Sequence, residues 1–298
     1  MAKKKFKTLL IFCRLMYTNN MKVDLHIHSN RSDGDLSPEE IVDKCDKSGL
    51  DLIALTDHDN VNGVMQAKRY AQTLSGGLKV LSGIELSAFD GELETHILAY
   101  GIDHTSAELQ EKMQKIQNMR EDRNLKMIYK LKTLGISIDY DLLKSRHEGE
   151  VIGRAHIAKE MVNLGVCSSV PDAFTRYLSP SGQAYVVTRR LTVPEAVSFA
   201  GKFGGIAVLA HPSKLKKNTA QTENFVRQLV QLGLVGIEAC YFSHTNIERD
   251  FYLYLAERYG LHVFGGSDFH NESYGVQLGA YYQPAPQTCD LLLKLAEN

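Results

Sequence analysis

Two histidines, two residues apart, open the part of the chain that could carry chemistry. His26 and His28 lie in VDLHIHSNRSDGD, residues 23–35, and Asp33 follows them in the same stretch. Side chains of a β-strand alternate between its two faces, so both imidazoles would leave the same face. Imidazole and carboxylate groups bind zinc, manganese and iron. The stretch is therefore either one corner of a metal site or a strand with one surface histidine and one core histidine.

Further histidines and carboxylates recur at the ends of other short apolar runs. Each has an ordinary explanation when taken alone, such as a turn, a helix N-cap, a salt bridge or a loop. Their shared position argues for a common site, because the carboxyl ends of the strands in a parallel barrel converge on one face. The residues at these positions are His58, Glu85, His96, His211, Asp268 and His270. The remaining histidines, for which structural or surface positions are expected, are His104, His147, His156, His244 and His262.

The apolar runs alternate with helical patterns along most of the chain. Strands are predicted at 22–28, 51–57, 78–86, 95–101, 205–211, 235–241 and 262–268, and helices at 37–50, 61–74, 191–204, 222–233 and 246–260. Capping boxes mark two helix starts, from Ser37 to Glu40 and from Thr192 to Glu195. Strands that are apolar throughout and alternate with helices predict an α/β fold, either a parallel sheet with helices on both faces or a barrel.

One stretch breaks this alternation. Residues 106–135 have the pattern of one long, charged, amphipathic helix, and 152–165 and 170–178 also have helical patterns. No strand is predicted between them. We therefore expect a helical insertion between two portions of an α/β body.

Composition and charge narrow the class of protein. The 298 residues are 44% hydrophobic and 23% charged, with a net charge of -1, which is typical of a soluble globular protein. A nearly neutral chain creates no global field that attracts nucleic acid or membrane, so an anionic ligand needs a local site. Five cysteines without a C-x-x-C pair favour a reducing cytoplasm.

The first 20 residues differ from the rest of the chain. They read MAKKKFKTLLIFCRLMYTNN, in which Arg14 interrupts the apolar run and no small-residue cleavage site follows. A disordered extension over 1–20 is therefore expected rather than an export signal. No apolar run in the chain approaches the roughly 20 residues needed to span a membrane.

The candidate ligands are rich in imidazole and poor in negative charge. Three divalent cations would bring a charge of +6 against the -3 of three carboxylates, which favours an anionic ligand such as phosphate. Such a site suits zinc, manganese or iron rather than calcium. The nine candidates are His26, His28, Asp33, His58, Glu85, His96, His211, Asp268 and His270.

The motifs that carry these residues resemble the PHP (polymerase and histidinol phosphatase) superfamily. They are DLHIHSNRSDGDLSPEEIV, LIALTDHDNVNGV, VLSGIELSA, THILAYGI, AVLAHPSK and FGGSDFH. The resemblance implies a distorted (β/α)7 barrel with two to three divalent metal ions, manganese first, with zinc or iron as alternatives. One metal would bind His26, His28, Glu85 and Asp268, a second Glu85, His96 and His211, and a third Asp33, His58 and His270.

The resemblance and the element pattern together divide the chain. Residues 21–104 and 186–298 are predicted to form the metal-dependent barrel, and 105–185 the helical insertion domain. The insertion and its IGRAHIA segment resemble one subgroup, whose members remove the 3'-phosphate of 3',5'-nucleoside bisphosphates or trim short RNA from the 5' end. In that subgroup the segment lies near the substrate.

Two residues of this segment are candidate substrate contacts. The guanidinium of Arg154 suits phosphate oxygens, and His156 is a second candidate. The alternative for Arg154 is a surface position at a helix N-terminus. Ala155 departs from the proline that is typical of the subgroup.

The resemblance implies hydrolysis of a phosphomonoester by attack of a metal-bound hydroxide. His211 and Asp268 are the candidate catalytic residues, and either His211 or a metal-bound water would donate the proton to the leaving oxygen. The expected partner is a nucleotide or a short oligoribonucleotide, with no DNA duplex and no membrane. The alternatives are a histidinol phosphatase, a 5'-3' exoribonuclease and a non-catalytic metal-binding module.

Overall fold

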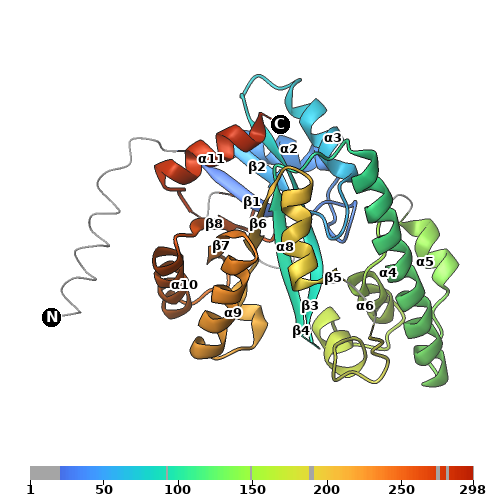
Figure 1. Ribbon diagram of the computed structural model, residues 1–298. Coiled ribbons are helices and arrows are strands. Elements are labelled where there is room, and N and C mark those ends of the chain that lie inside the picture. Colours follow the sequence, from blue (N-terminus) through green and yellow to red (C-terminus); the bar gives the residue numbers. More distant parts are fainter. Residues whose placement is uncertain are drawn as a thin grey trace.

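The computed structural model describes most of the chain (Figure 1). The described residues are 21–91, 93–147, 150–187, 191–272, 276–279 and 282–297. The expected extension over residues 1–20 lies outside them.

Seven strands form one nearly closed barrel, in the order β1-β2-β3-β4-β6-β7-β8. They are β1 (Val23–Ile27), β2 (Leu52–Leu55), β3 (Lys79–Asp90), β4 (Leu93–Tyr100), β6 (Ile206–Leu209), β7 (Leu234–Tyr241) and β8 (His262–Gly266). A parallel bridge between Ile27 and Phe269 brings the two ends of the order together. The short β5 (Leu191–Thr192) pairs with β3 outside this order. The predicted barrel is confirmed.

One strand of the barrel runs against the others. β4 pairs antiparallel with β3 and with β6, whereas β1, β2 and β3 pair in parallel, as do β6, β7 and β8. The start of β4 therefore lies at the end of the barrel where the parallel strands finish. His96, which opposes Ser87 of β3, joins the residues that follow the ends of those strands. This orientation explains why a ligand at the beginning of a strand belongs with ligands at the ends of others.

Helices cover the outside of the barrel (Figure 1). They are α2 (Pro38–Lys47), α3 (Asn62–Ala71), α8 (Val193–Lys202), α9 (Thr219–Gln231), α10 (Asn246–Tyr259) and α11 (Pro286–Ala296). Both predicted capping boxes are present, at the starts of α2 and α8. The sequence patterns did not predict α11. Among the described residues, none of the helices is both long enough and apolar enough to cross a membrane.

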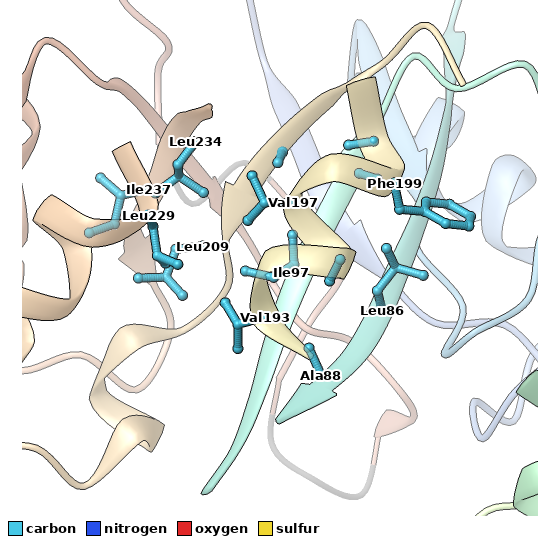
Figure 2. Packing of buried hydrophobic residues seen from close by; sticks show 14 of the residues in the cluster. Leu86, Ala88, Ile97, Val193, Val197, Phe199, Leu209, Leu229, Leu234 and Ile237 are labelled. Atoms are coloured by element: carbon cyan, nitrogen blue, oxygen red, sulfur yellow. The ribbon is translucent and has the colours of Figure 1, made fainter. Parts of the chain in front are cut away.

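The packing of α8 shows how an apolar helix stripe fixes the barrel wall (Figure 2). Val193, Val197 and Phe199 are buried in one cluster with Leu86 of β3 and Ile97 of β4. Burying one such side chain stabilises the fold by about 1.5–3 kcal/mol relative to leaving it in water. This cluster holds β3 and β4 in place, and those two strands carry Glu85 and His96.

The predicted insertion is helical throughout its regular structure. It contains α4 (Ala107–Thr133), α5 (Tyr140–Arg146), α6 (Arg154–Asn163), α7 (Val170–Ala173) and the single π-helical turn η1 (Phe174–Leu178). Buried side chains between Met127 and Ala184 form a core cluster of their own. Ion pairs from Arg120 to Asp59 and from Lys159 to Asp35 tie this helical group to the loops of the barrel. The domain boundaries themselves stay a prediction.

Candidate metal centre

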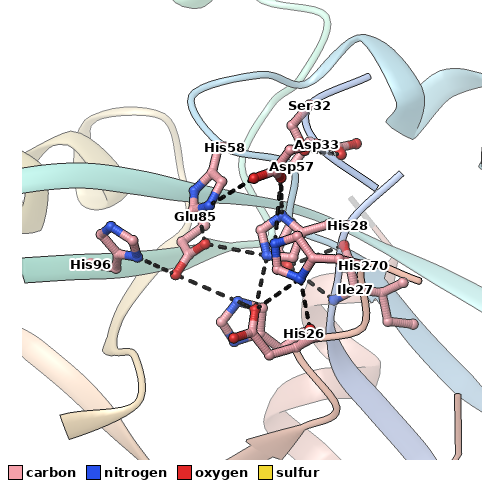
Figure 3. Close-up of polar contacts among 12 residues, drawn as sticks. His26, Ile27, His28, Ser32, Asp33, Asp57, His58, Glu85, His96 and His270 are labelled. Carbon is pink, nitrogen blue, oxygen red and sulfur yellow. Dashed lines mark hydrogen bonds and ion pairs between the residues drawn. The ribbon is translucent and has the colours of Figure 1, made fainter. Parts of the chain in front are cut away.

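The nine predicted ligands meet at one end of the barrel, where Figure 3 shows most of them converging on Glu85. The Glu85 carboxylate lies 2.9 Å from His58 Nδ1, 2.8 Å from His96 Nδ1 and 2.9 Å from His211 Nε2. Its oxygens also lie 3.5 Å from His26 Nε2 and 3.3 Å from His28 Nε2. One carboxylate on β3 is thus shared by five histidines from four segments of the chain.

Two further carboxylates complete the cluster. Asp268 Oδ1, just after β8, lies 3.2 Å from the Nε2 atoms of both His26 and His28. Asp33 Oδ1, in the loop after β1, lies 3.4 Å from His270 Nε2 and 3.8 Å from His28 Nδ1. Each carboxylate therefore bridges two rings.

The donor atoms fall into three overlapping groups, each within 4.8 Å, that could each hold a metal ion. They are His26, His28, Glu85 and Asp268; His58, Glu85 and His96; and His28, Asp33, His58 and His270. The first group is the one implied for the first metal. The second group contains His58 where the implied set had His211, whose Nε2 contacts Glu85. The third group contains the implied set together with His28.

The hydrogen bonding of these donors fits metal binding. Several buried donor atoms have no hydrogen-bond partner: His26 Nε2, both ring nitrogens of His28, Asp33 Oδ1, His58 Nδ1 and Glu85 Oε2. A buried polar atom without a partner is costly in an ordinary core. Atoms of this kind that converge from several strands are expected where a cation supplies the missing interaction.

The electrostatics of the cluster favour ionised carboxylates. Burial alone would raise the pKa of Glu85, but His96, His58 and His26 hold the pKa of that carboxyl well below its usual range. Burial alone would also raise the pKa of Asp268, but Lys214 and His26 hold the pKa of that carboxyl well below its usual range. Carboxylates that stay ionised are ready to bind cations.

The rings around these carboxylates behave differently from one another. Burial opposes a charge on His28, but the carboxylates of Asp268 and Glu85 beside its Nε2 raise its pKa to about 10. Burial together with nearby Lys214 lowers the pKa of His211 to about 3. Metal binding requires neutral imidazole, so metals that enter this centre must displace protons from rings such as His28.

Glu238 on β7 orients two of the ligands. Its Oε1 lies 3.0 Å from His26 Nδ1, and its Oε2 accepts a hydrogen bond of 2.7 Å from the main-chain N–H of His211. A carboxylate that binds the second nitrogen of a metal-ligating histidine fixes the ring orientation and strengthens the ligand. Glu238 lies in the predicted strand 235–241, and these two contacts define its role.

Asp268 has supporting contacts of its own. Its Oδ2 accepts from Lys214 Nζ at 2.9 Å and from the hydroxyl of Tyr241 at 2.7 Å. This leaves Oδ1 facing His26 and His28. Sequence reasoning missed both donors, although Lys214 lies in the AVLAHPSK motif three residues after His211.

The backbone is strained where ligands leave their strands. His211 has φ 24° and Asp268 has φ 51°, in the left-handed region that residues with a Cβ rarely adopt. Such conformations persist at functional sites because the surrounding structure holds them. Here the Glu238 contact to the His211 N–H and the two donors on Asp268 supply that support.

A pocket of about 100 Å³ opens beside the cluster, between the barrel and the insertion. It is lined by Asp33, His58, Ser87, Glu94, His96, Arg120, Arg123, Gly153, Arg154, Ala155 and Phe174. Arg154 is the first residue of α6, and its Nη2 lies 2.5 Å from Glu94 Oε2. The segment that was expected near the substrate therefore forms one wall of this pocket.

His156 lies behind that wall. Its Nδ1 accepts a hydrogen bond of 3.0 Å from the Gly153 N–H, and its Nε2 lies 3.3 Å from Glu150 Oε2. The ring is buried. Its Nδ1 thus holds the N-cap Gly153, which directly precedes Arg154, and its Nε2 lies beside Glu150.

Comparisons with known proteins agree with this geometry. The model of the PHP domain matches residues 24–168. A 3',5'-nucleoside bisphosphate phosphatase from Chromobacterium violaceum is 31% identical over 90% of this chain and 93% of that protein. A 5'-3' exoribonuclease from Haemophilus influenzae is 32% identical over 87% of this chain and 93% of that protein.

A solved structure agrees as well. The protein is from Bifidobacterium adolescentis and is assigned as a metal-dependent phosphoesterase. It matches with a TM-score of 0.83 and 27% identity, covering 93% of this chain and 97% of that one. With its barrel, its histidine and carboxylate cluster and these relatives, the chain belongs to the PHP family of metal-dependent phosphoesterases.

Proposed function

We propose that this phosphoesterase removes a phosphate group from nucleotides, most specifically the 3'-phosphate of 3',5'-nucleoside bisphosphates. The observation that carries the proposal is the pocket that joins Arg154 to the ligands Asp33, His58 and His96. A bisphosphate has one group to be hydrolysed at the metal centre and a second that needs a cation nearby. The bisphosphate phosphatase of C. violaceum, similar over most of both chains, supports this choice.

The nine ligand residues would hold two to three divalent metals, with manganese as the expected ion. Such ions supply Lewis acidity and a nucleophilic water at neutral pH. The protein's share is to fix the donors: Glu85 sits between the groups, Glu238 orients His26, and Lys214 and Tyr241 orient Asp268. His211 and Asp268 are the proposed catalytic residues. A neutral His211 ring carries one N–H, which it can donate to the leaving oxygen.

The start of α6 would bind the second phosphate. Gly153 is the N-cap of this helix and has no side chain that could cap it, so the first N–H groups can face an anion. The guanidinium of Arg154 adds a fork of donors that matches phosphate oxygens. His156 would contribute indirectly, since its Nδ1 holds the Gly153 N–H and thereby sets the position of Arg154.

Phosphate release in manganese tests the proposal. The substrates are adenosine 3',5'-bisphosphate, adenosine 5'-monophosphate, histidinol phosphate and a 5'-phosphorylated oligoribonucleotide. We expect the fastest release from the bisphosphate, and Arg154→Ala should raise its KM more than tenfold while the protein stays folded. Preference for histidinol phosphate, or an unchanged KM in the variant, would overturn the nucleotide assignment.

A second candidate is 5'-3' trimming of short RNA, because room for a longer substrate exists on the other side of His96. A pocket of about 180 Å³ there is lined by Glu94, Thr95, His96, Ala210, His211, Lys214 and Leu215. A chain of nucleotides could extend across His96 from one pocket into the other. The exoribonuclease of H. influenzae gives this reading support. Release of mononucleotides from the oligoribonucleotide would favour it.

A further inference from the structure

Glu94 lies beside the candidate metal centre but belongs to none of its three ligand groups. It lies on β4, two residues before His96, so both side chains leave the same face of the strand. Glu94 Oε1 lies 3.8 Å from His96 Nε2, and Oε2 lies 2.5 Å from Arg154 Nη2. The carboxylate thus spans the gap between a metal ligand and the candidate phosphate contact, and it lines the pockets on both sides of His96.

A second arginine of the pocket of about 100 Å³, Arg120, is committed elsewhere. Arg120 donates to Asp59 Oδ2 at 2.7 Å through Nε and to the Ser87 hydroxyl at 2.9 Å through Nη2. That pair is buried. Arg154 differs, because its side chain and that of Glu94 keep 16% and 19% of their surface exposed. Both side chains thus keep some contact with water at the pocket, where another anion can reach the guanidinium.

We propose that Glu94 is an internal counterion that competes with the second phosphate of the substrate for Arg154. This inference rests on the proposed function. Before the substrate binds, the carboxylate fills the guanidinium fork. A phosphate oxygen must displace it, and the carboxylate returns when the product leaves. Glu94 thereby weakens binding of every anion at Arg154 and speeds release of a product that still carries its 5'-phosphate.

A purely structural role for Glu94 would have different consequences. The insertion does not depend on Glu94 for its attachment, since the Arg120–Asp59 and Lys159–Asp35 pairs also hold it to the barrel. A carboxylate that merely docked α6 would weaken the fold when removed. A carboxylate that merely oriented His96 would act on metal binding and turnover, whether or not Arg154 is present.

Calorimetric titration of the manganese-loaded protein with adenosine 5'-monophosphate reads the Arg154 contact without bisphosphate turnover. The variants are Glu94→Gln, Arg154→Ala, both together, and Glu160→Gln. The last is a matched control that removes one carboxylate from an ion pair with Arg146; Glu160 lies on α6, six residues after Arg154. Phosphate release from the bisphosphate is measured in parallel, so failure of the proposed function is seen separately.

We expect Glu94→Gln to lower the Kd for the monophosphate by about three- to tenfold, which corresponds to one partly exposed ion pair. Its KM for the bisphosphate should fall by a similar factor, and kcat should not rise, because the product leaves Arg154 more slowly. The effect should vanish in the Arg154→Ala background, and Glu160→Gln should bind as the wild type does. Weaker or unchanged binding in Glu94→Gln, or an effect that persists without Arg154, would overturn the inference.

Discussion

The contacts of Glu238 allow a quantitative prediction for Glu238→Gln. Glutamine keeps the shape of the side chain but offers one acceptor oxygen and one NH2 group. Both groups that face Glu238 are donors: the main-chain N–H of His211 always, and Nδ1–H of His26 whenever Nε2 binds a metal. In the variant one of these donors must face another donor.

The expected cost follows from burial. Glu238 is only 1% exposed, so water cannot replace the lost contact. Losing a buried hydrogen bond to a charged group costs about 1.5–3 kcal/mol. With 1.4 kcal/mol for each factor of ten, manganese affinity should fall roughly 10- to 150-fold. This range agrees with the effect of removing other outer partners of metal-bound histidines.

Metal-stripped protein is titrated with manganese, and calorimetry measures the affinity. Phosphate release from the same samples measures turnover. Glu223→Gln is the matched control, because it removes the same charge from an ion pair with Arg258 on the helical surface. Urea unfolding of the metal-free variants separates a loss of affinity from a loss of fold. Manganese affinity and turnover equal to the wild type in Glu238→Gln would refute the role assigned to this carboxylate.

Three further predictions concern the metals, the barrel and the insertion. Chelation should abolish phosphate release and lower the Tm, and manganese at 100 times its Kd should restore about 2.7 kcal/mol of apparent stability; an unchanged Tm after chelation would count against a metal centre. Gly266→Ala should destabilise the protein and weaken manganese binding, because its Cβ would lie 2.4 Å from His26 Cβ and 2.5 Å from His26 N. Gly201→Ala, whose Cβ would meet nothing within 4 Å, is the control, and equal unfolding midpoints would contradict this reading. Arg120→Ala should cost about 3–5 kcal/mol in urea unfolding, because it removes the buried partner of Asp59, whereas Arg146→Ala at an exposed pair should cost less than about 1 kcal/mol.

Local patterns in the sequence predicted much of the barrel and the ligand cluster. Strand ends carried His58, His211 and Asp268, and capping boxes at Ser37 and Thr192 marked helix starts that the structure confirms. These features depend on residues within a few positions of one another. Their convergence followed from the rule that parallel strands end on one face of a barrel.

Local sequence patterns could not predict contacts between distant segments of the chain. The antiparallel direction of β4 depends on its pairing with β3 and β6, which no local pattern specifies. The role of Glu238 depends on His26, 212 positions away, and the Glu94–Arg154 pair joins residues 60 positions apart. His156 had a pattern that suited a substrate contact, yet its hydrogen bond to Gly153 is visible only in the folded insertion.

We propose that the residues grouped around Glu85 at this end of the barrel would hold two to three divalent metals. Anomalous diffraction from crystals soaked in manganese tests it most directly. The account predicts two to three peaks within the ligand groups around Glu85, Asp268 and Asp33. The absence of peaks there, or a single peak elsewhere such as beside His147 and Glu150, would contradict it.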